Sequence, residues 1–491
     1  MVGRHPLSRR LAVLLAVIGS LSSACGSSVL TERAAGTAGQ AGSTEFAAGT
    51  AADGSVPGSV DIGAVGVPGA TSGAAGGGAG AGGATSVPYE LGVKGLTQGI
   101  TDTSIKIGIP VIAGAEAVAG LLGAANIRPG DNGLETRALV ADINARGGIN
   151  GRKIDAQFYA VDFGNPASVE ANALAACNHF ADDLKVFAIL MVINPPVSFT
   201  SCAAQKGVIM LNGSLSPQDD KLIAAAQPWY YSPTLLSQSR FWEPLLDSVG
   251  GRGVIERGDK VAVFALDRLP FTRIASEVVM PALKARGYEV SAYERVLTEA
   301  SIQNAVLRFR ESGATHVLFV QESGIADLLF MRQAEAQKYR PTYLLTSYDV
   351  PGYLLEGNVA PEQIAGIQGI GWMPLADVAP HREPLSAQES RCFQILTAGG
   401  EPQGARQDFL TAQFTCDLVW SFEAIARAAG PQLSTVSFKS GYHSVGTDYA
   451  PATVYRTDFS KRVDGVSAFR PLGYVTSCRC LQYLGPLETL P

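Results

Sequence analysis

The sequence predicts an α/β protein built from two doubly wound, Rossmann-like lobes joined by a hinge. Short apolar segments alternate with helix-like segments from about residue 101, which is the βαβ pattern of a parallel sheet. Residues 186–193 are almost wholly apolar, as expected of a strand buried on both faces. The alternation restarts near residue 260, and 491 residues are too many for one core. We therefore expect two α/β lobes.

The N-terminus is predicted to be the signal peptide of a lipoprotein, residues 1–25. Arginines precede an apolar run, residues 11–21, that is too short to span a bilayer as a helix. Cys25 follows small residues, as in a lipobox, although Ser22 stands where an aliphatic residue is usual. Lipidation of Cys25 would anchor the protein stably on the outer side of the cell membrane. The general secretory and twin-arginine export routes both stay open.

Residues 26–97 are predicted to be a disordered linker. Gly, Ala, Ser and Thr dominate this stretch, which cannot bury enough apolar surface to offset the entropy of ordering. Its G-x-G-x-x-G pattern at residues 78–83 has no strand before it and no helix after it. We interpret that pattern as a chance match in biased sequence, and we expect no nucleotide cofactor.

The first lobe is expected to comprise residues 101–238 and 364–447. Each of the first three predicted strands is followed by a helix, and glycines or a proline mark the boundaries. The expected strands are 104–111, 153–162, 186–193 and 208–211, and the expected helices are 133–146, 166–184, 196–205 and 408–429.

The second lobe is expected to comprise residues 239–363 and 448–491. Two of its helices end at glycines, Gly287 and Gly313, and the tail after about residue 450 is predicted to form hairpin strands. The expected strands are 260–266, 290–296, 316–320 and 342–346, and the expected helices are 272–286, 302–312 and 325–339.

The segment between the first helix and the second strand carries the most specific pattern. Residues 143–154 read INARGGINGRKI; Gly147-Gly148 should end the helix and Asn150-Gly151 should form a turn. This segment resembles, almost letter for letter, a signature of the type I periplasmic binding proteins, which are branched-chain amino-acid receptors of ABC importers. The resemblance implies lobes joined by three crossings that close on a small polar or amino-acid-like solute and deliver it to an ABC permease. A ligand-sensing ectodomain that signals through a membrane partner is the alternative.

The candidate ligand site follows from the strand order, because ligands of open α/β sheets lie beyond the carboxyl ends of the strands. Hydroxyls and helix N-termini in the first lobe could hold a carboxylate, an acid in the second lobe could hold an ammonium group, and an aromatic ring could cover an apolar body. A serine at a helix start can equally be only an N-cap. The candidates are Asn194, Ser198, Ser214, Ser216, Asp267, Phe271, Gln321, Glu322, Tyr348 and Asp349.

Enzyme, metal and nucleic-acid functions find no support in the sequence. No G-x-S-x-G, Walker A, H-E-x-x-H or C-x-x-C pattern occurs. A net charge of −6, with 17% charged residues, provides no basic field for nucleic acid. We therefore expect a non-enzymatic protein without catalytic residues, bound metal or cofactor.

The cysteines predict disulfides. Of seven cysteines, Cys25 belongs to the leader, which leaves an even six in an exported domain. Cys177 and Cys202 lie in the helices on either side of the strand 186–193, and neighbouring crossover helices on one face of a sheet pack side by side. We expect these two to pair. The partners of Cys392, Cys416, Cys478 and Cys480 stay open.

Overall fold

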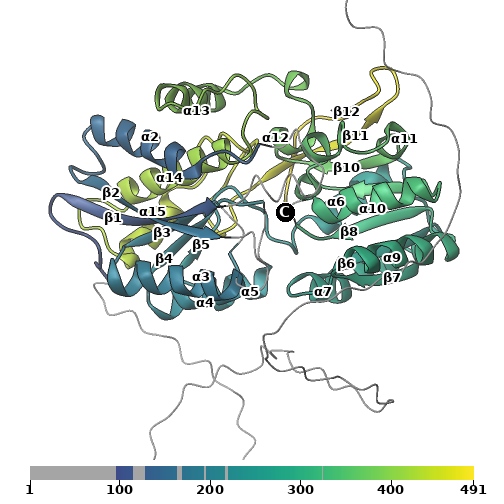
Figure 1. Cartoon of the computed structure of the whole chain (residues 1–491), viewed down its shortest axis with the longest axis horizontal. Coiled ribbons are helices and arrows are strands. Elements are labelled where there is room, and N and C mark those ends of the chain that lie inside the picture. The colour runs from purple at the N-terminus through teal and green to yellow at the C-terminus, as the bar shows by residue number, and fades with distance from the viewer. Residues whose placement is uncertain (1–95, 114–127, 163–168, 193–194, 216–218, 323) are drawn as a thin grey trace, which may run out of the picture. The chain divides into compact units, whose positions relative to one another are not determined.

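The computed structural model describes residues 96–113, 128–162, 169–192, 195–215, 219–322 and 324–491. The predicted signal peptide with Cys25, nearly all of the predicted linker, and Asn194 and Ser216 lie outside these residues. Within them, the chain forms two separate sheets flanked by helices (Figure 1). The predicted α/β class is confirmed.

The first sheet has five parallel strands in the order β2-β1-β3-β4-β5. Alternate residues of the third strand in the chain (Ala188–Met191) face opposite sides of the sheet. Ala188 and Leu190 pack in the core on one side, and Ile189 and Met191 pack in the core on the other. This alternation is why the run is apolar throughout. The strands are β1 (Ser104–Ala113), β2 (Lys153–Asp162), β3 (Ala188–Met191), β4 (Ile209–Asn212) and β5 (Tyr230–Tyr231).

Helices cover both faces of the first sheet (Figure 1). One face carries α3 (Val169–Asn178), a π-helical turn (His179–Asp183) and α4 (Val197–Gln205). The other face carries α2 (Asn132–Ala145), α13 (Ala387–Ala398), α14 (Thr411–Ala428) and α15 (Thr435–Val445). The short α5 (Asp220–Ala225) follows β4.

The second sheet has the order β12-β11-β10-β9-β8-β6-β7, with β13 paired to β11. Strands β6 to β10 are parallel, and the C-terminal β11 to β13 are antiparallel, as expected of a hairpin tail. The strands are β6 (Lys260–Leu266), β7 (Glu289–Val296), β8 (His316–Val320), β9 (Thr342–Leu345), β10 (Ile367–Gly371), β11 (Ala468–Val475), β12 (Cys480–Tyr483) and β13 (Glu488–Thr489).

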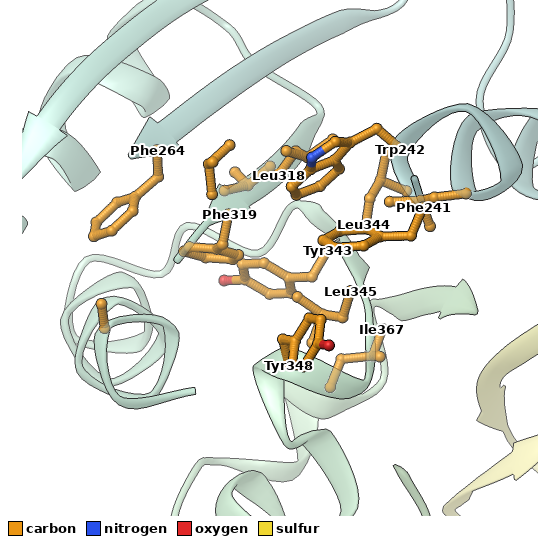
Figure 2. Packing of buried hydrophobic residues seen from close by; sticks show 14 of the residues in the cluster. Phe241, Trp242, Phe264, Leu318, Phe319, Tyr343, Leu344, Leu345, Tyr348 and Ile367 are labelled. Atoms are coloured by element: carbon orange, nitrogen blue, oxygen red, sulfur yellow. The ribbon is translucent and has the colours of Figure 1, made fainter. Parts of the chain in front are cut away.

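Aromatic residues from neighbouring strands fill the second core (Figure 2). The ring of Phe319 on β8 lies 5.2 Å from that of Phe264 on β6 and 6.1 Å from that of Tyr343 on β9. The longer helices around this sheet are α6 (Trp242–Gly251), α9 (Glu299–Glu311) and α10 (Ile325–Ala336), with the short α7 (Phe271–Ile274), α8 (Met280–Ala285), α11 (Pro361–Ile364) and α12 (Pro374–Asp377).

The return to the first lobe comes later than the expected residue 364. Strand β10 pairs with β9, and Ile367 and Ile370 are fully buried in the second core. Gly369 permits this pairing, because a Cβ there would lie 1.8 Å from the carbonyl oxygen of Leu345. The chain regains the first lobe only at α13, since Cys392 and Phe393 of that helix pack in its core.

The lobes are connected three times, after β5, after β10 and after α15. The first and third connections contact each other through an isolated β-bridge between Ser232 and Asp464. The Asp464 carboxylate also accepts hydrogen bonds from the backbone N–H of Ser237 at 3.1 Å and from the guanidinium of Arg240 at 2.9 Å. This network fixes the region around which the lobes could rotate.

The segment INARGGINGRKI anchors β2 and α2 to the C-terminal half of α14. Gly148 has a φ of +74°, and a Cβ there would lie 2.0 Å from the carbonyl oxygen of Arg152. Arg146 donates to both oxygens of Glu423, at 3.0 and 3.2 Å. The Asn144 amide donates to and accepts from the backbone of Ile154. The segment therefore has a structural role in the first lobe.

Three disulfides occur in the described residues. Cys177 in α3 pairs with Cys202 in α4, as the helix order predicts, with Cα atoms 6.4 Å apart. Cys392 in α13 pairs with Cys416 in α14, and Cys478 pairs with Cys480 in the turn before β12. Among the described residues, no helix has the length and apolar character needed to cross a membrane.

Candidate functional site

Ion pairs join the start of α5, which follows β4 of the first sheet, to the helical segment that follows β6 of the second sheet. Asp219, which is buried, pairs with Arg273 of α7. Lys221 pairs with Glu277 at 2.6 Å, and both of these side chains are exposed. Because β4 and β6 belong to different sheets, the carboxyl edges of the two lobes are in contact at this junction.

Two of the predicted serine ligands of the first lobe, Ser198 and Ser214, form hydrogen bonds within the protein. Ser198, the second residue of α4, donates a hydrogen bond to the Glu170 carboxylate of α3. Ser214 is buried, and its backbone N–H donates to the side-chain oxygen of Asn212 at 3.2 Å. Both residues lie at the carboxyl ends of strands, as predicted, and their role in ligand binding stays a prediction.

Two of the three candidate ammonium partners are paired with arginines of their own lobe. Asp267 accepts a hydrogen bond from Nε of Arg295 at 2.7 Å. Glu322, with only 9% of its side chain exposed, pairs with Arg268, which is half-exposed. Each carboxylate is thus already neutralised by a neighbouring cation.

Asp349, the third candidate, is buried within the loop after β9. Its carboxyl accepts hydrogen bonds from the backbone N–H of Thr346 at 2.7 Å and from the Gln321 amide at 2.8 Å. Burial raises its pKa to about 6, against these hydrogen bonds, which favour the ionised form. These hydrogen bonds fix the conformation of the loop after β9, and Gln321, another predicted ligand residue, takes part in them.

The predicted aromatic wall lies inside the second core. The Tyr348 hydroxyl donates to the carbonyl of Leu236 and accepts from its N–H, both at 2.8 Å. Tyr348 therefore positions the first connection between the lobes. Phe271 is 2% exposed, and the Arg268 guanidinium lies 5.5 Å from its ring centre.

A cavity of about 250 Å³ opens beside Glu322, between the sheet and the N-terminal ends of α9 and α10. Its wall is mostly apolar, and its polar side chains are those of Arg268, Thr298, Glu299 and Glu322. The apolar lining comprises Phe264, Leu266, Val296, Leu297, Ile302, Ile325, Ala326 and Leu329.

The sequence reasoning missed Arg268, Arg273 and Asp219. All three follow strands at the carboxyl edges, so the rule that selected the other candidates could also have selected them. No group of three or more His, Cys, Asp or Glu side chains within the described ranges is arranged to hold a metal ion.

Comparison with known proteins identifies the family. The sequence model of the family described as periplasmic binding protein matches residues 122–466, well over half of the chain. No curated protein sequence matches the chain. A solute-binding protein of an ABC transporter from R. palustris, solved with 4-hydroxybenzoate, has a TM-score of 0.59 and 15% identity over 79% of this chain and 96% of its own.

Two further solved structures share the fold. An ABC transporter substrate-binding protein from Desulfitobacterium hafniense, in complex with leucine, has a TM-score of 0.55 and 12% identity over 78% of this chain and 99% of its own. A branched-chain amino-acid ABC transporter protein from Thermus thermophilus, with bound valine, has a TM-score of 0.57 and 15% identity over 79% of this chain and 96% of its own. With its two sheets, its three connections and this match, the chain belongs to the periplasmic binding protein family and has the type I fold.

Proposed function

We propose that this chain is an extracytoplasmic solute-binding lipoprotein of an ABC importer. It captures a small polar or amino-acid-like solute between its two lobes and delivers it to a membrane permease, while lipidated Cys25 holds it at the cell membrane. The observation that carries this proposal is the ion pair between Asp219 and Arg273, which links α5 and α7 at the carboxyl edges of two different sheets. Ligands of open α/β sheets lie at these edges.

The mechanism is hinge closure. The three connections absorb the rotation, and a solute that contacts both edges favours the closed arrangement by its extra affinity for that state. The ion pairs at the junction add contacts that exist only when the edges meet. Similarity to proteins solved with leucine, valine and 4-hydroxybenzoate supports a small solute.

A ligand-sensing ectodomain that reports to a membrane partner is the second candidate, since hinge closure can serve signalling as well as transport. Uptake assays separate the two. Cells that lack the chain should lose import of its solute if the chain feeds a permease, and should keep import but lose the transcriptional or kinase response if it is a sensor.

Native mass spectrometry of the purified full-length protein tests the proposal. We expect a small molecule that co-purifies with the folded protein and leaves on unfolding. Calorimetry with that molecule should then give one site per chain. Failure to find any bound or added solute, in a panel of amino acids, organic acids, amides and sugars, would refute the receptor function.

A further inference from the structure

The cavity beside Glu322 provides an apolar compartment at the binding edge of the second lobe. Its volume of about 250 Å³ lies just below the usual range of small-molecule pockets and suits a short alkyl chain or one aromatic ring. Leu297 lines it and is 70% exposed, more than any other large hydrophobic residue in the described part of the chain. A ligand body in the cavity would cover this side chain and gain hydrophobic free energy.

Four pairs of charged groups around this edge are matched within the protein, whereas Glu299, which also lines the cavity, is exposed to solvent. Glu322 pairs with Arg268, and Asp267 pairs with Arg295. At the junction with the first lobe, Asp219 pairs with Arg273 and Lys221 with Glu277. A charged ligand group placed at the pair of Arg268 and Glu322 must separate that pair or lose its own hydration without a new partner, and both cost free energy.

Arg268 also interacts electrostatically with a carboxylate of the first lobe. Partial burial lowers the pKa of its guanidinium, and the negative charge of Glu170 on α3 opposes that shift. The cation thus pairs with Glu322 of its own lobe and is stabilised by the negative charge of Glu170 of the first lobe. In an amino-acid receptor, the ligand's ammonium group would need such a carboxylate, whereas here the chain supplies the cation itself.

From these contacts we infer that the solute is an uncharged amphipathic molecule, with an apolar body in the cavity and a neutral hydrogen-bonding head at the pair of Arg268 and Glu322. A primary amide illustrates the fit, because its oxygen can accept from the guanidinium while its NH₂ group donates to the carboxylate. The pair then stays intact and no charge is desolvated alone. This inference rests on the proposed receptor function and narrows its ligand class.

Four probes with one branched alkyl body separate the possible heads: 4-methylpentanamide, 4-methylpentanoate, 3-methylbutylamine and leucine. Calorimetry on the full-length protein should show the amide binding about tenfold or more tightly than each charged probe. Equal or tighter binding of leucine or of the acid would overturn the inference and leave the receptor function standing. Binding of none of the four would also overturn it, and the receptor function would then depend on the broader solute panel.

Substitutions locate the site. Leu297→Ser, at an exposed position, should weaken binding of 4-methylpentanamide about tenfold, whereas Leu307→Ser, on the exposed side of α9, should not weaken it.

Arg268→Gln should remove the internal cation and create an ammonium site at Glu322, so that 3-methylbutylamine binds about tenfold more tightly. Arg308→Gln is the matched control, because it breaks an exposed pair with Glu294 on the same lobe. An unchanged amine affinity in Arg268→Gln, with an unchanged melting temperature, would refute the role of Arg268.

Discussion

Replacing Glu135 by glutamine is predicted to flatten the dependence of stability on pH in the neutral range. Glu135, in α2, is fully buried beside Glu401 and receives hydrogen bonds from the hydroxyls of Thr411 and Thr415 at the start of α14. Burial raises its pKa from 4.5 to about 8, and the neighbouring charge of Glu401 adds to this shift. At neutral pH the carboxyl is therefore protonated in the folded protein and ionised in the unfolded chain.

The sign and size of the effect follow from proton linkage. Between pH 4.5 and 8 unfolding releases a proton, so the free energy of unfolding falls as pH rises, by about 1.4 kcal/mol per pH unit. From pH 5 to pH 7 this amounts to about 2 to 3 kcal/mol. Glutamine cannot ionise, and its NH₂ group can donate to Glu401, so the variant should lose this part of the slope.

Urea unfolding at pH 5, 6 and 7 measures the difference. The wild-type protein should lose about 2 to 3 kcal/mol more stability across this range than Glu135→Gln does. Glu299→Gln, on the exposed first turn of α9, is the control and should follow the wild-type slope. Identical slopes for Glu135→Gln and the wild type would show that Glu135 is not held protonated, and would refute the reasoning.

Three further predictions concern the disulfide, the anchor and the junction. Replacing both Cys177 and Cys202 by alanine should lower the free energy of unfolding by about 3 kcal/mol in the chain-entropy model, since the bond spans 25 residues. The control is removal of the disulfide between Cys478 and Cys480, which spans two residues and should lower the free energy of unfolding in urea much less. Cys25→Ala should release the protein into the medium or leave the leader uncleaved, and unchanged membrane fractionation would contradict lipidation. Arg273→Gln should leave Asp219 buried without its cation. It should lower the free energy of solute binding by more than it lowers the free energy of unfolding, and an unchanged affinity would exclude a role for this pair in closure.

The class of the fold could be predicted from the sequence because its signals are local. Residues 186–193 are apolar throughout, since alternate side chains face two different cores, and glycines mark the helix ends. The return to the first lobe could not be placed correctly. Strand β10 is short and contains Gly369 and Gly371, and it belongs to the second sheet only because those glycines allow close approach to β9 and α12.

The candidate site was predictable in position but not in chemistry. The strand order places Ser198, Glu322 and Asp267 at carboxyl edges, as the rule for α/β sheets requires. Their partners are distant in sequence, as Arg268 is from Glu322, and no local sequence pattern predicts such a pair. The sequence likewise identified Cys177 with Cys202 from the helix order, whereas Cys392 and Cys416 lie in helices whose contact depends on the late return of the chain.

Small-angle X-ray scattering of the full-length protein, with and without a solute whose binding calorimetry has established, tests the central claim most directly. Hinge closure predicts that saturating solute lowers the radius of gyration and raises the melting temperature by mass action. Arg273→Gln should show a smaller decrease at the same fractional saturation. A scattering profile that does not change when the solute is fully bound would contradict a receptor that works by closing its two lobes.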